Sequence, residues 1–314
     1  MRVLVYRALG LGDFLTAVPA YRATASAFPA YDVCLAAPEP LRALAGLTGA
    51  VDTFVPTAEL AAPDWEGPPP DVAVNLHGRG PDSHRLLTSL SPGRLVAFAR
   101  PDLGIAGPQW RPEEHEVARW CRLLADSGLP ADPQDLDLAV PDAPPPYEGA
   151  TVVHPGAAGA ARRWPADRYA SVARRLHDAG HHVLVTGVAA ERPLVDAVVG
   201  SAGLPTDRAL AGQLGLAAMA ALVAAARLVI CGDTGVAHLA TAYRVPSVLL
   251  FGPMSPELWG PPPTRRQHRV LWRGQRTSPR VPAASTPDPG LLAIGVPDVV
   301  AAVADLDLRP QRSR

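Results

Sequence analysis

The sequence predicts an α/β protein built from two doubly wound parallel sheets, and two observations lead to this fold class. Short apolar strands alternate with amphipathic helices along nearly all of the 314 residues, which is typical of parallel sheets with helices on both faces. A proline-rich run at residues 141–146 interrupts the alternation, which restarts after it. We therefore expect two domains, residues 1–143 and 144–314.

The first half begins with a strand over residues 1–8 and a glycine-rich turn that ends at Asp13. Apolar residues then recur every three or four positions from Phe14, which predicts a helix through residue 28. The following elements are expected in order: strand 31–37, helix 39–47, strand 51–55, loop 59–70, strand 71–76, helix 83–90, strand 95–98 and a helix that ends near Ser127.

The second half repeats the alternation. A loop of small residues, 155–161, follows its first strand. The expected elements are strand 151–154, a helix around residues 169–176, strand 182–186, a helix from about residue 191, helix 216–223, strand 228–231, helix 236–243, strand 247–251 and one closing helix suggested by residues 291–294 and 296–306. Residues 308–314 are expected to form a frayed tail.

Composition narrows the function classes. The formal net charge is −1 and no basic stripe is present, which argues against a nucleic-acid partner and favours a small molecule. Cys34, Cys121 and Cys231 lack the spacing of zinc ligands, which indicates buried thiols in a reducing compartment. No apolar run reaches the roughly 20 residues that span a bilayer, so we expect a cytoplasmic protein.

One pair of carboxylates has the spacing of a metal site. Asp135-Leu136-Asp137 has the form D-x-D, which binds a divalent ion in metal-dependent sugar transferases. The two acids alternate with leucines, however, and this favours the solvent face of a strand. We therefore expect neither a metal nor a cofactor.

The turn Gly232-Asp233-Thr234-Gly235 joins a buried strand to a helix. Thr234 suits the N-cap position, and the free amides behind it favour an anion such as phosphate at the positive helix end. His238 lies four residues after Thr234 and so shares its side of the helix. The alternative is an ordinary capped helix start.

Asp13 stands at the mouth of the first strand-to-helix turn. The preceding Gly10-x-Gly12 lacks the third glycine of a dinucleotide-binding fingerprint. The carboxylate can be a first-turn acid that pairs with the helix dipole, or a general base at the carboxyl edge of the sheet, where α/β proteins bind their ligands.

Three further positions carry candidate ligand contacts, each with a structural alternative. Arg162 follows the small-residue loop and could bind phosphate, or it could be simply solvated. Glu191 could contact a ligand or only pair with a helix dipole. His77 and Arg79, in a glycine-containing loop after a strand, belong to an ordinary polar loop or contact an acceptor.

These motifs together resemble glycosyltransferase family 9, the heptosyltransferase-like enzymes. D-T-G-x-x-H-L-A-x-A over residues 233–242, followed by F-G-P and W-G-P, is similar to the family's C-terminal signature. Gly12-Asp13 with Pro19 matches the family's G-D-x-x-x-x-x-P. Residues 162–165 match its K-x-W-P, with Arg162 in place of the lysine.

The resemblance implies the GT-B architecture, with two domains facing across a cleft and a final helix packing back towards the first. It implies inverting, metal-independent transfer of a heptose-like sugar from a nucleotide diphosphate, ADP-heptose in the family, to a glycan or glycolipid hydroxyl. Asp13 would be the base and His77 and Arg79 weaker acceptor contacts. The donor-binding residues would be Arg162, Glu191 (near the ribose), Asp233, Thr234, Gly235 and His238.

Two other functions stay open on the same scaffold. One is a protein that binds a nucleotide sugar without catalysis, and the other is a nucleotide-sugar hydrolase or epimerase. Peripheral association with a membrane also stays open, since the family's acceptor is a glycolipid.

Overall fold

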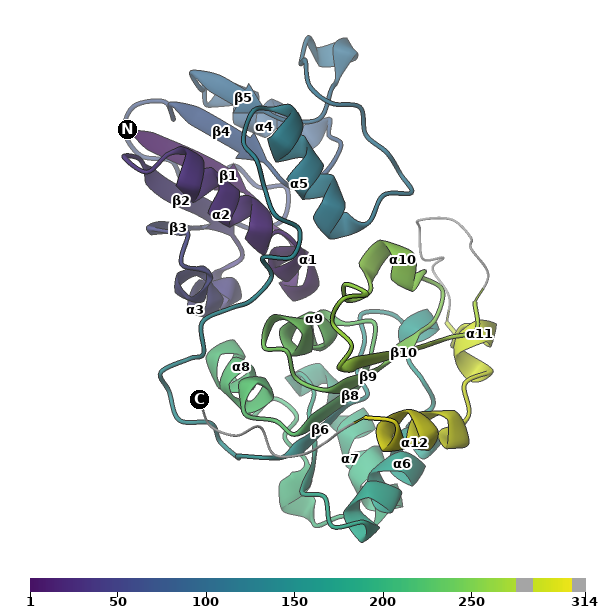
Figure 1. Ribbon diagram of the computed structural model, residues 1–314. Coiled ribbons are helices and arrows are strands. Elements are labelled where there is room, and N and C mark those ends of the chain that lie inside the picture. Colours follow the sequence, from purple (N-terminus) through teal and green to yellow (C-terminus); the bar gives the residue numbers. More distant parts are fainter. Residues whose placement is uncertain (275–284, 307–314) are drawn as a thin grey trace. The chain divides into compact units, whose positions relative to one another are not determined.

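A computed structural model describes residues 1–274 and 285–306. The chain divides into two compact units, Met1–Ala139 and Val140–Arg314 (Figure 1). Each unit has its own five-stranded parallel sheet. The α/β fold class with two parallel sheets is therefore confirmed, and the expected tail at residues 308–314 lies outside the described residues.

The sheet of the first unit has the strand order β3-β2-β1-β4-β5. The central strand, β1, is apolar from Val3 to Tyr6 and buried, as expected for a strand covered on both faces. The strands are β1 Arg2–Tyr6, β2 Asp32–Ala37, β3 Thr53–Pro56, β4 Val72–Asn75 and β5 Arg94–Val96.

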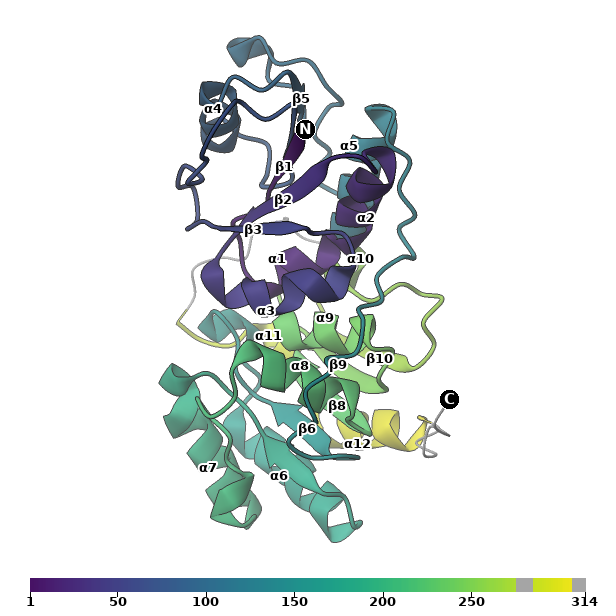
Figure 2. The same ribbon diagram turned by 90° about the vertical axis from the view of Figure 1, so that its left-hand side faces the viewer.

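Helices cover both faces of this sheet. Helix α2 packs against α5 on one face, and α4 lies on the other (Figures 1 and 2). The α-helices are α1 Leu11–Thr16, α2 Val18–Ala27, α3 Arg42–Ala45, α4 Asp82–Ser89 and α5 Glu116–Asp126, and the 3-10 helices are η1 Glu39–Leu41, η2 Gly46–Thr48 and η3 Pro101–Leu103.

Two local expectations for the first unit were wrong. The single helix expected through residue 28 is two helices that meet at Ala17, because Pro19 cannot donate a backbone hydrogen bond and suits only the first turn of a new helix. Residues 135–139 form no strand. Instead, the guanidinium of Arg22 binds the carboxylate of Asp135 and the carbonyl oxygen of Asp137.

The sheet of the second unit has the order β10-β9-β8-β6-β7. β10 was not anticipated, because it lies in an arginine- and proline-rich stretch; it pairs with β9 at the sheet edge and is only half-buried. The strands are β6 Thr151–His154, β7 Val183–Val185, β8 Leu228–Gly232, β9 Ser247–Phe251 and β10 His268–Trp272.

In the second unit, α6 packs against α7 and α12 on one face, and α8 packs against α9 on the other (Figure 1). The α-helices are α6 Ala166–Asp178, α7 Arg192–Ala202, α8 Leu216–Ala224, α9 Gly235–Ala242, α10 Pro256–Trp259, α11 Pro289–Leu292 and α12 Val296–Ala304, and the 3-10 helices are η4 Ala160–Arg162, η5 Ala189–Glu191 and η6 Thr206–Arg208.

The closing helix α12 belongs to the core of the second unit. Val299 and Val303 are buried with residues of α6 and of the sheet, and α12 also contacts β9 and β10. Its apolar face is covered within its own unit, and the expected packing of this helix towards the first domain stays a prediction.

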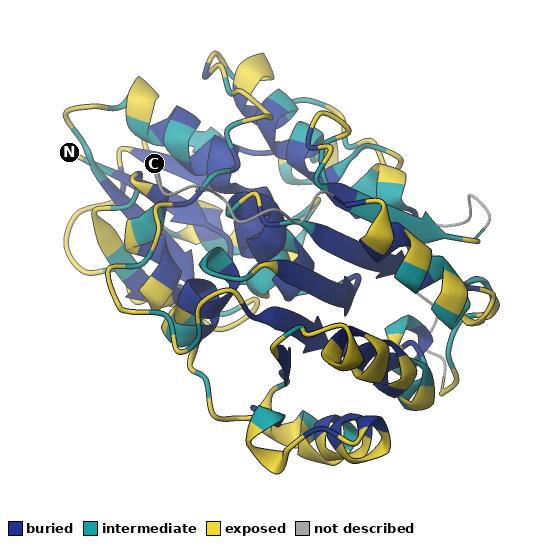
Figure 3. Cartoon of the chain, turned by 60° about the horizontal axis from the view of Figure 1, so that its bottom comes forward, coloured by how far each residue is buried: buried dark blue, intermediate teal, exposed yellow. Residues whose placement is uncertain are grey.

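Buried apolar side chains concentrate on the strands, while the outer sides of the helices are exposed (Figure 3). Cys34, Cys121 and Cys231 are buried free thiols. Each α-helix formed by residues 1–274 and 285–306 is too short or too polar to cross a membrane.

Candidate functional site

Both sheets have a topological switch point, where successive connections leave in opposite directions. In the first unit this point lies between β1 and β4, and in the second between β6 and β8. Ligands of open α/β sheets bind at the carboxyl ends of strands at such points. Asp13 follows β1 and His77 follows β4, whereas Arg162 follows β6 and Asp233 follows β8. The candidate residues of each unit thus cluster around its switch point.

Asp13 lies in the first turn of α1, whose N-cap is Gly10. Its side chain keeps 32% of its surface exposed, and one carboxylate oxygen lies 3.2 Å from the guanidinium of Arg7. Burial, the largest influence, raises the pKa of Asp13, while Arg7 opposes the rise and Glu116 adds to it. A carboxylate with a raised pKa and partial access to solvent can accept a proton from a substrate hydroxyl.

The buried cluster behind Asp13 was missed at the sequence level. Arg7 is fully buried at the end of β1, and its guanidinium binds Glu116 of α5 at 3.0 Å. Arg119 binds the other carboxylate oxygen of Glu116, and Trp120 donates its ring N–H to Glu116 at 2.8 Å. An arginine directly after an apolar strand was the available signal, because a buried guanidinium requires an acidic partner.

His77 lies in the loop after β4, at the same switch point. Its backbone N–H donates to the Asn75 side chain at 3.1 Å, and its ring lies 5.0 Å from the ring of Tyr6. Burial lowers its pKa to about 4, so the imidazole is neutral at pH 7. Its Nδ1 atom is buried without a hydrogen-bond partner among the described residues. Arg79, two residues on, is exposed.

In the second unit, an ion pair joins the two loops at the switch point. The guanidinium of Arg162, at the end of η4, lies 3.5 Å from the carboxylate of Asp233, which is 6% exposed. The Nε of Arg162 is buried and has no hydrogen-bond partner within the part of the chain that the structure describes. The arginine is therefore oriented by Asp233 and retains donor capacity for an anion.

Helix α9 begins at Gly235, two residues after Asp233. Thr234 occupies the N-cap position, as expected, but its hydroxyl makes no capping hydrogen bond. The first backbone amides of a helix have no partner within the helix, and they lie at its positive end. The ring of His238, one turn along, lies 6.1 Å from that of Trp259 in an edge-on arrangement. These groups can surround an anion held at the amides of Thr234 and Gly235.

Glu191 lies on the loop after β7, next to β6 in the sheet. Its carboxylate accepts the N–H of Val188 at 3.0 Å and lies over Gly156. A Cβ atom at Gly156 would be 2.2 Å from a carboxylate oxygen, so a side chain there would displace Glu191. Behind it, the pKa of buried His154 is lowered by burial, and Glu191 opposes that change.

The predicted residues therefore fall into one group in each unit. In the first unit, Asp13 and His77 are linked through Arg7, which contacts Asp13 and the carbonyl of Leu76. In the second unit, Arg162 contacts Asp233 directly. The group in the second unit also includes Thr234, Gly235, His238 and, on the neighbouring loop, Glu191. Within residues 1–274 and 285–306, no cluster of three or more His, Cys, Asp or Glu side chains could hold a metal ion.

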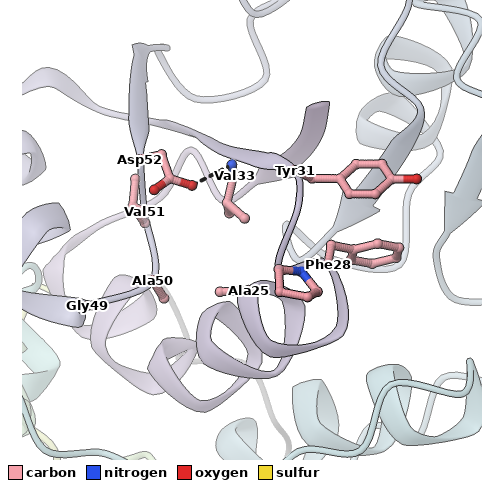
Figure 4. A pocket seen from close by; sticks show the side chains of 9 residues that line it. Ala25, Phe28, Tyr31, Val33, Gly49, Ala50, Val51 and Asp52 are labelled. Carbon is pink, nitrogen blue, oxygen red and sulfur yellow. Dashed lines mark hydrogen bonds between the residues drawn. The ribbon is translucent and has the colours of Figure 1, made fainter. Parts of the chain in front are cut away.

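A pocket of about 200 Å³ lies at the opposite edge of the first sheet (Figure 4). Phe28 and Tyr31 form one side, and Asp52, before β3, forms another. The Asp52 carboxylate accepts the N–H of Val33 at 2.9 Å and so links two strands. This pocket lies where the strands begin, away from the carboxyl ends that carry Asp13 and His77.

Comparisons with known proteins match the family that the motifs resemble. The model of the family described as glycosyltransferase family 9 (heptosyltransferase) matches residues 108–287, more than half of the chain. Lipopolysaccharide heptosyltransferase 2 of Escherichia coli K12 is 36% identical over 123 residues, which cover 37% of this chain and 34% of the relative. The chain thus matches about a third of that relative's length.

Solved structures resemble the chain over nearly its whole length. The ADP-heptose lipopolysaccharide heptosyltransferase II of E. coli has a TM-score of 0.76 at 20% identity, covering 97% of this chain and 98% of that one. A family 9 glycosyltransferase from Veillonella parvula has a TM-score of 0.78 at 19% identity, with 96% of both chains covered. Likeness at this level of identity shows the fold, which is the expected GT-B class.

Proposed function

This chain belongs to glycosyltransferase family 9, and we propose that it transfers a heptose-like sugar from ADP-heptose to a hydroxyl group of a glycan or glycolipid. One observation carries the proposal: three motifs that are far apart in the sequence each place a residue at the switch point of its own sheet. Asp13 comes from one motif, Arg162 from the second and Asp233 from the third. The choice of donor is supported by the likeness to heptosyltransferases of E. coli, one of which is described as an ADP-heptose lipopolysaccharide heptosyltransferase.

The second unit is the proposed donor domain. The amides of Thr234 and Gly235 and the guanidinium of Arg162 would bind the diphosphate, since these donors cluster where an anion is favoured. Glu191 would accept hydrogen bonds from the ribose hydroxyls, and the absence of a side chain at Gly156 leaves room for its carboxylate at this position. His238 would contact the sugar or the phosphate beside it.

The first unit is the proposed acceptor domain, with Asp13 as the general base. Its carboxylate takes the proton from the acceptor hydroxyl as the oxygen attacks the anomeric carbon. The bond from that carbon to the diphosphate breaks, and the nucleoside diphosphate leaves with the electron pair. Attack opposite the leaving group inverts the anomeric configuration. The environment that raises the pKa of Asp13 supports this role, because it strengthens the carboxylate as a base.

Two further roles complete the mechanism. The leaving diphosphate gains charge as the bond breaks, and the fixed amides of α9 together with Arg162 would stabilise it, so the transfer is proposed to be metal-independent. His77 would hydrogen-bond to the acceptor through its ring, which its low pKa keeps neutral. Arg79, which is exposed, would contact an acidic group of the acceptor.

Release of nucleoside diphosphate from ADP-heptose, with and without glycan or glycolipid acceptors, tests the proposal. Transfer predicts that release requires an acceptor and that the product carries the inverted linkage by NMR. Release at the same rate without acceptor would identify a hydrolase or an epimerase-like activity instead. Tight binding of the donor without release, under any acceptor, would identify a protein that only binds nucleotide sugars.

A further inference from the structure

The guanidinium of Arg7 binds two carboxylates that are more than 100 positions apart in the sequence. One of its nitrogens, NH2, lies 3.2 Å from Oδ1 of Asp13 and 3.0 Å from Oε1 of Glu116. Its Nε donates to the backbone carbonyl of Asp13 at 3.0 Å, and its Cζ atom lies 4.6 Å from the ring centroid of Trp120. Because Arg7 is fully buried, its position is set by these partners and not by solvent.

Glu116 is more buried than Asp13 and has more side-chain partners. It is 5% exposed, and the N–H of Trp120 donates to the same oxygen that binds Arg7, at 2.8 Å. Arg119 binds its second oxygen and is itself held by the carbonyls of Arg111, Pro112 and Glu114. Three side chains therefore hold the carboxylate of Glu116 in place, whereas the carboxylate of Asp13 is partly exposed to solvent.

We propose that Glu116 is a positioning residue that shares the Arg7 guanidinium with Asp13 and thereby keeps Asp13 basic enough to deprotonate the acceptor. An arginine paired with Asp13 alone would stabilise its ionised form and weaken it as a base. Glu116 offsets that positive charge while Arg7 continues to hold the Asp13 backbone and side chain. This inference rests on the proposed function, because it requires Asp13 to act as the base.

The other titratable groups near Asp13 have smaller effects on it than Glu116 or stay neutral. Glu59, in the loop after β3, also raises the pKa of Asp13, but it comes after Arg7 and Glu116 in the size of its effect. Tyr21 of α2 is fully buried and its own pKa is raised beyond the working range, so it stays neutral. Among the carboxylates that influence Asp13, Glu116 is the one that contacts Arg7 directly.

The pH dependence of transfer by the full-length enzyme tests the proposal. Glu116→Gln removes the charge and keeps the shape, so the acid limb of the kcat profile should move to lower pH by about 0.5 to 1 unit. The plateau rate should fall about threefold, because a weaker base transfers the proton less readily. Glu114→Gln is the matched control: Glu114 lies two residues away, pairs with Arg122 at 2.7 Å, and should leave the limb unchanged.

For a second variant, Arg119→Gln, we expect the acid limb of the kcat profile to shift in the opposite direction. This variant tests the role of Glu116 if Glu116→Gln does not fold. Arg119→Gln removes the positive charge on the other side of Glu116, so the acid limb should move to higher pH. A stationary limb in both folded variants, or a shift of Arg119→Gln to lower pH, would overturn the role of Glu116. Two different results would contradict the proposed function itself: wild-type turnover in Asp13→Asn, or no transfer with any acceptor.

Discussion

The two units have sheets of the same size but sites of opposite character. In the first unit, the switch point is backed by buried charged side chains: Arg7, Glu116 and Arg119 are at most 6% exposed. In the second unit, the corresponding edge is formed by small residues, the start of α9 and one ion pair. In our proposal, the first arrangement controls the protonation of Asp13, and the second provides room and hydrogen-bond donors for the diphosphate of the donor. The difference divides the proposed reaction into proton transfer and donor binding.

The largest effect is expected from removal of the base. Asp13→Asn keeps the shape of the side chain and most of its contacts with Arg7, but an amide cannot accept the acceptor's proton. We expect kcat to fall by about 10² to 10⁴. Steady-state assays of nucleoside diphosphate release, with saturating donor and acceptor, measure this change. If kcat of Asp13→Asn falls less than fivefold, Asp13 is not the group that accepts the proton.

Removal of the guanidinium in the second unit should act on donor affinity. Arg162→Gln should weaken binding of ADP-heptose about 10- to 100-fold, because a charge-assisted contact with the diphosphate is lost. Arg162→Lys retains the positive charge and introduces the residue of the family motif, so it should lose less. Isothermal titration calorimetry measures both, with Arg175→Gln, an exposed change on α6, as the control. Equal affinity of wild type and Arg162→Gln would exclude this contact.

A smaller effect tests the packing of Glu191. In Gly156→Ala, the new methyl group would lie about where the carboxylate of Glu191 now lies, so that side chain must move. We expect the KM for the donor to rise about tenfold, because the donor would lose one hydrogen bond to the charged carboxylate of Glu191. Gly159→Ala, in the same loop with no atom within 4 Å of its added methyl, should leave KM unchanged. If the two variants behave alike, Glu191 does not contact the donor.

The smallest effect concerns stability. Because the pKa of Asp13 is raised in the folded protein, its ionised form disfavours folding at pH values above that pKa, and this cost disappears as the pH falls below the unfolded value of about 3.9. Asp13→Asn should therefore raise Tm by about 2 to 4 °C at pH 7. The difference should shrink between about pH 7 and pH 3 in calorimetric scans. A Tm difference that grows towards low pH would contradict the direction of the pKa shift.

Local signals in the sequence predicted most of the fold and the positions of the motif residues. The apolar strands and the turn at Asp233 depend on neighbouring residues, so periodicity and glycine placement were sufficient. Two misses also had local causes: Pro19 divides a helix, and β10 is a half-buried edge strand in a polar stretch.

The pairing of Arg7 with Glu116 could not be predicted in the same way. Arg7 lies directly after β1 and Glu116 lies on α5. The apolar strand before Arg7 signals that an acidic partner is needed, but the sequence does not show which acid the fold brings to it. The same limit applied to Asp135, whose partner Arg22 lies on α2. Long-range partners require the tertiary structure, because the hydrophobic pattern alone does not specify them.

The most direct test of the division between the units is a side-by-side measurement of ADP-heptose affinity by calorimetry in Asp13→Asn and Arg162→Gln. We predict that Asp13→Asn binds the donor within about twofold of wild type while its turnover collapses. Arg162→Gln should bind at least about tenfold more weakly. An equal loss of donor affinity in the two variants would contradict the assignment of proton transfer to the first unit and donor binding to the second.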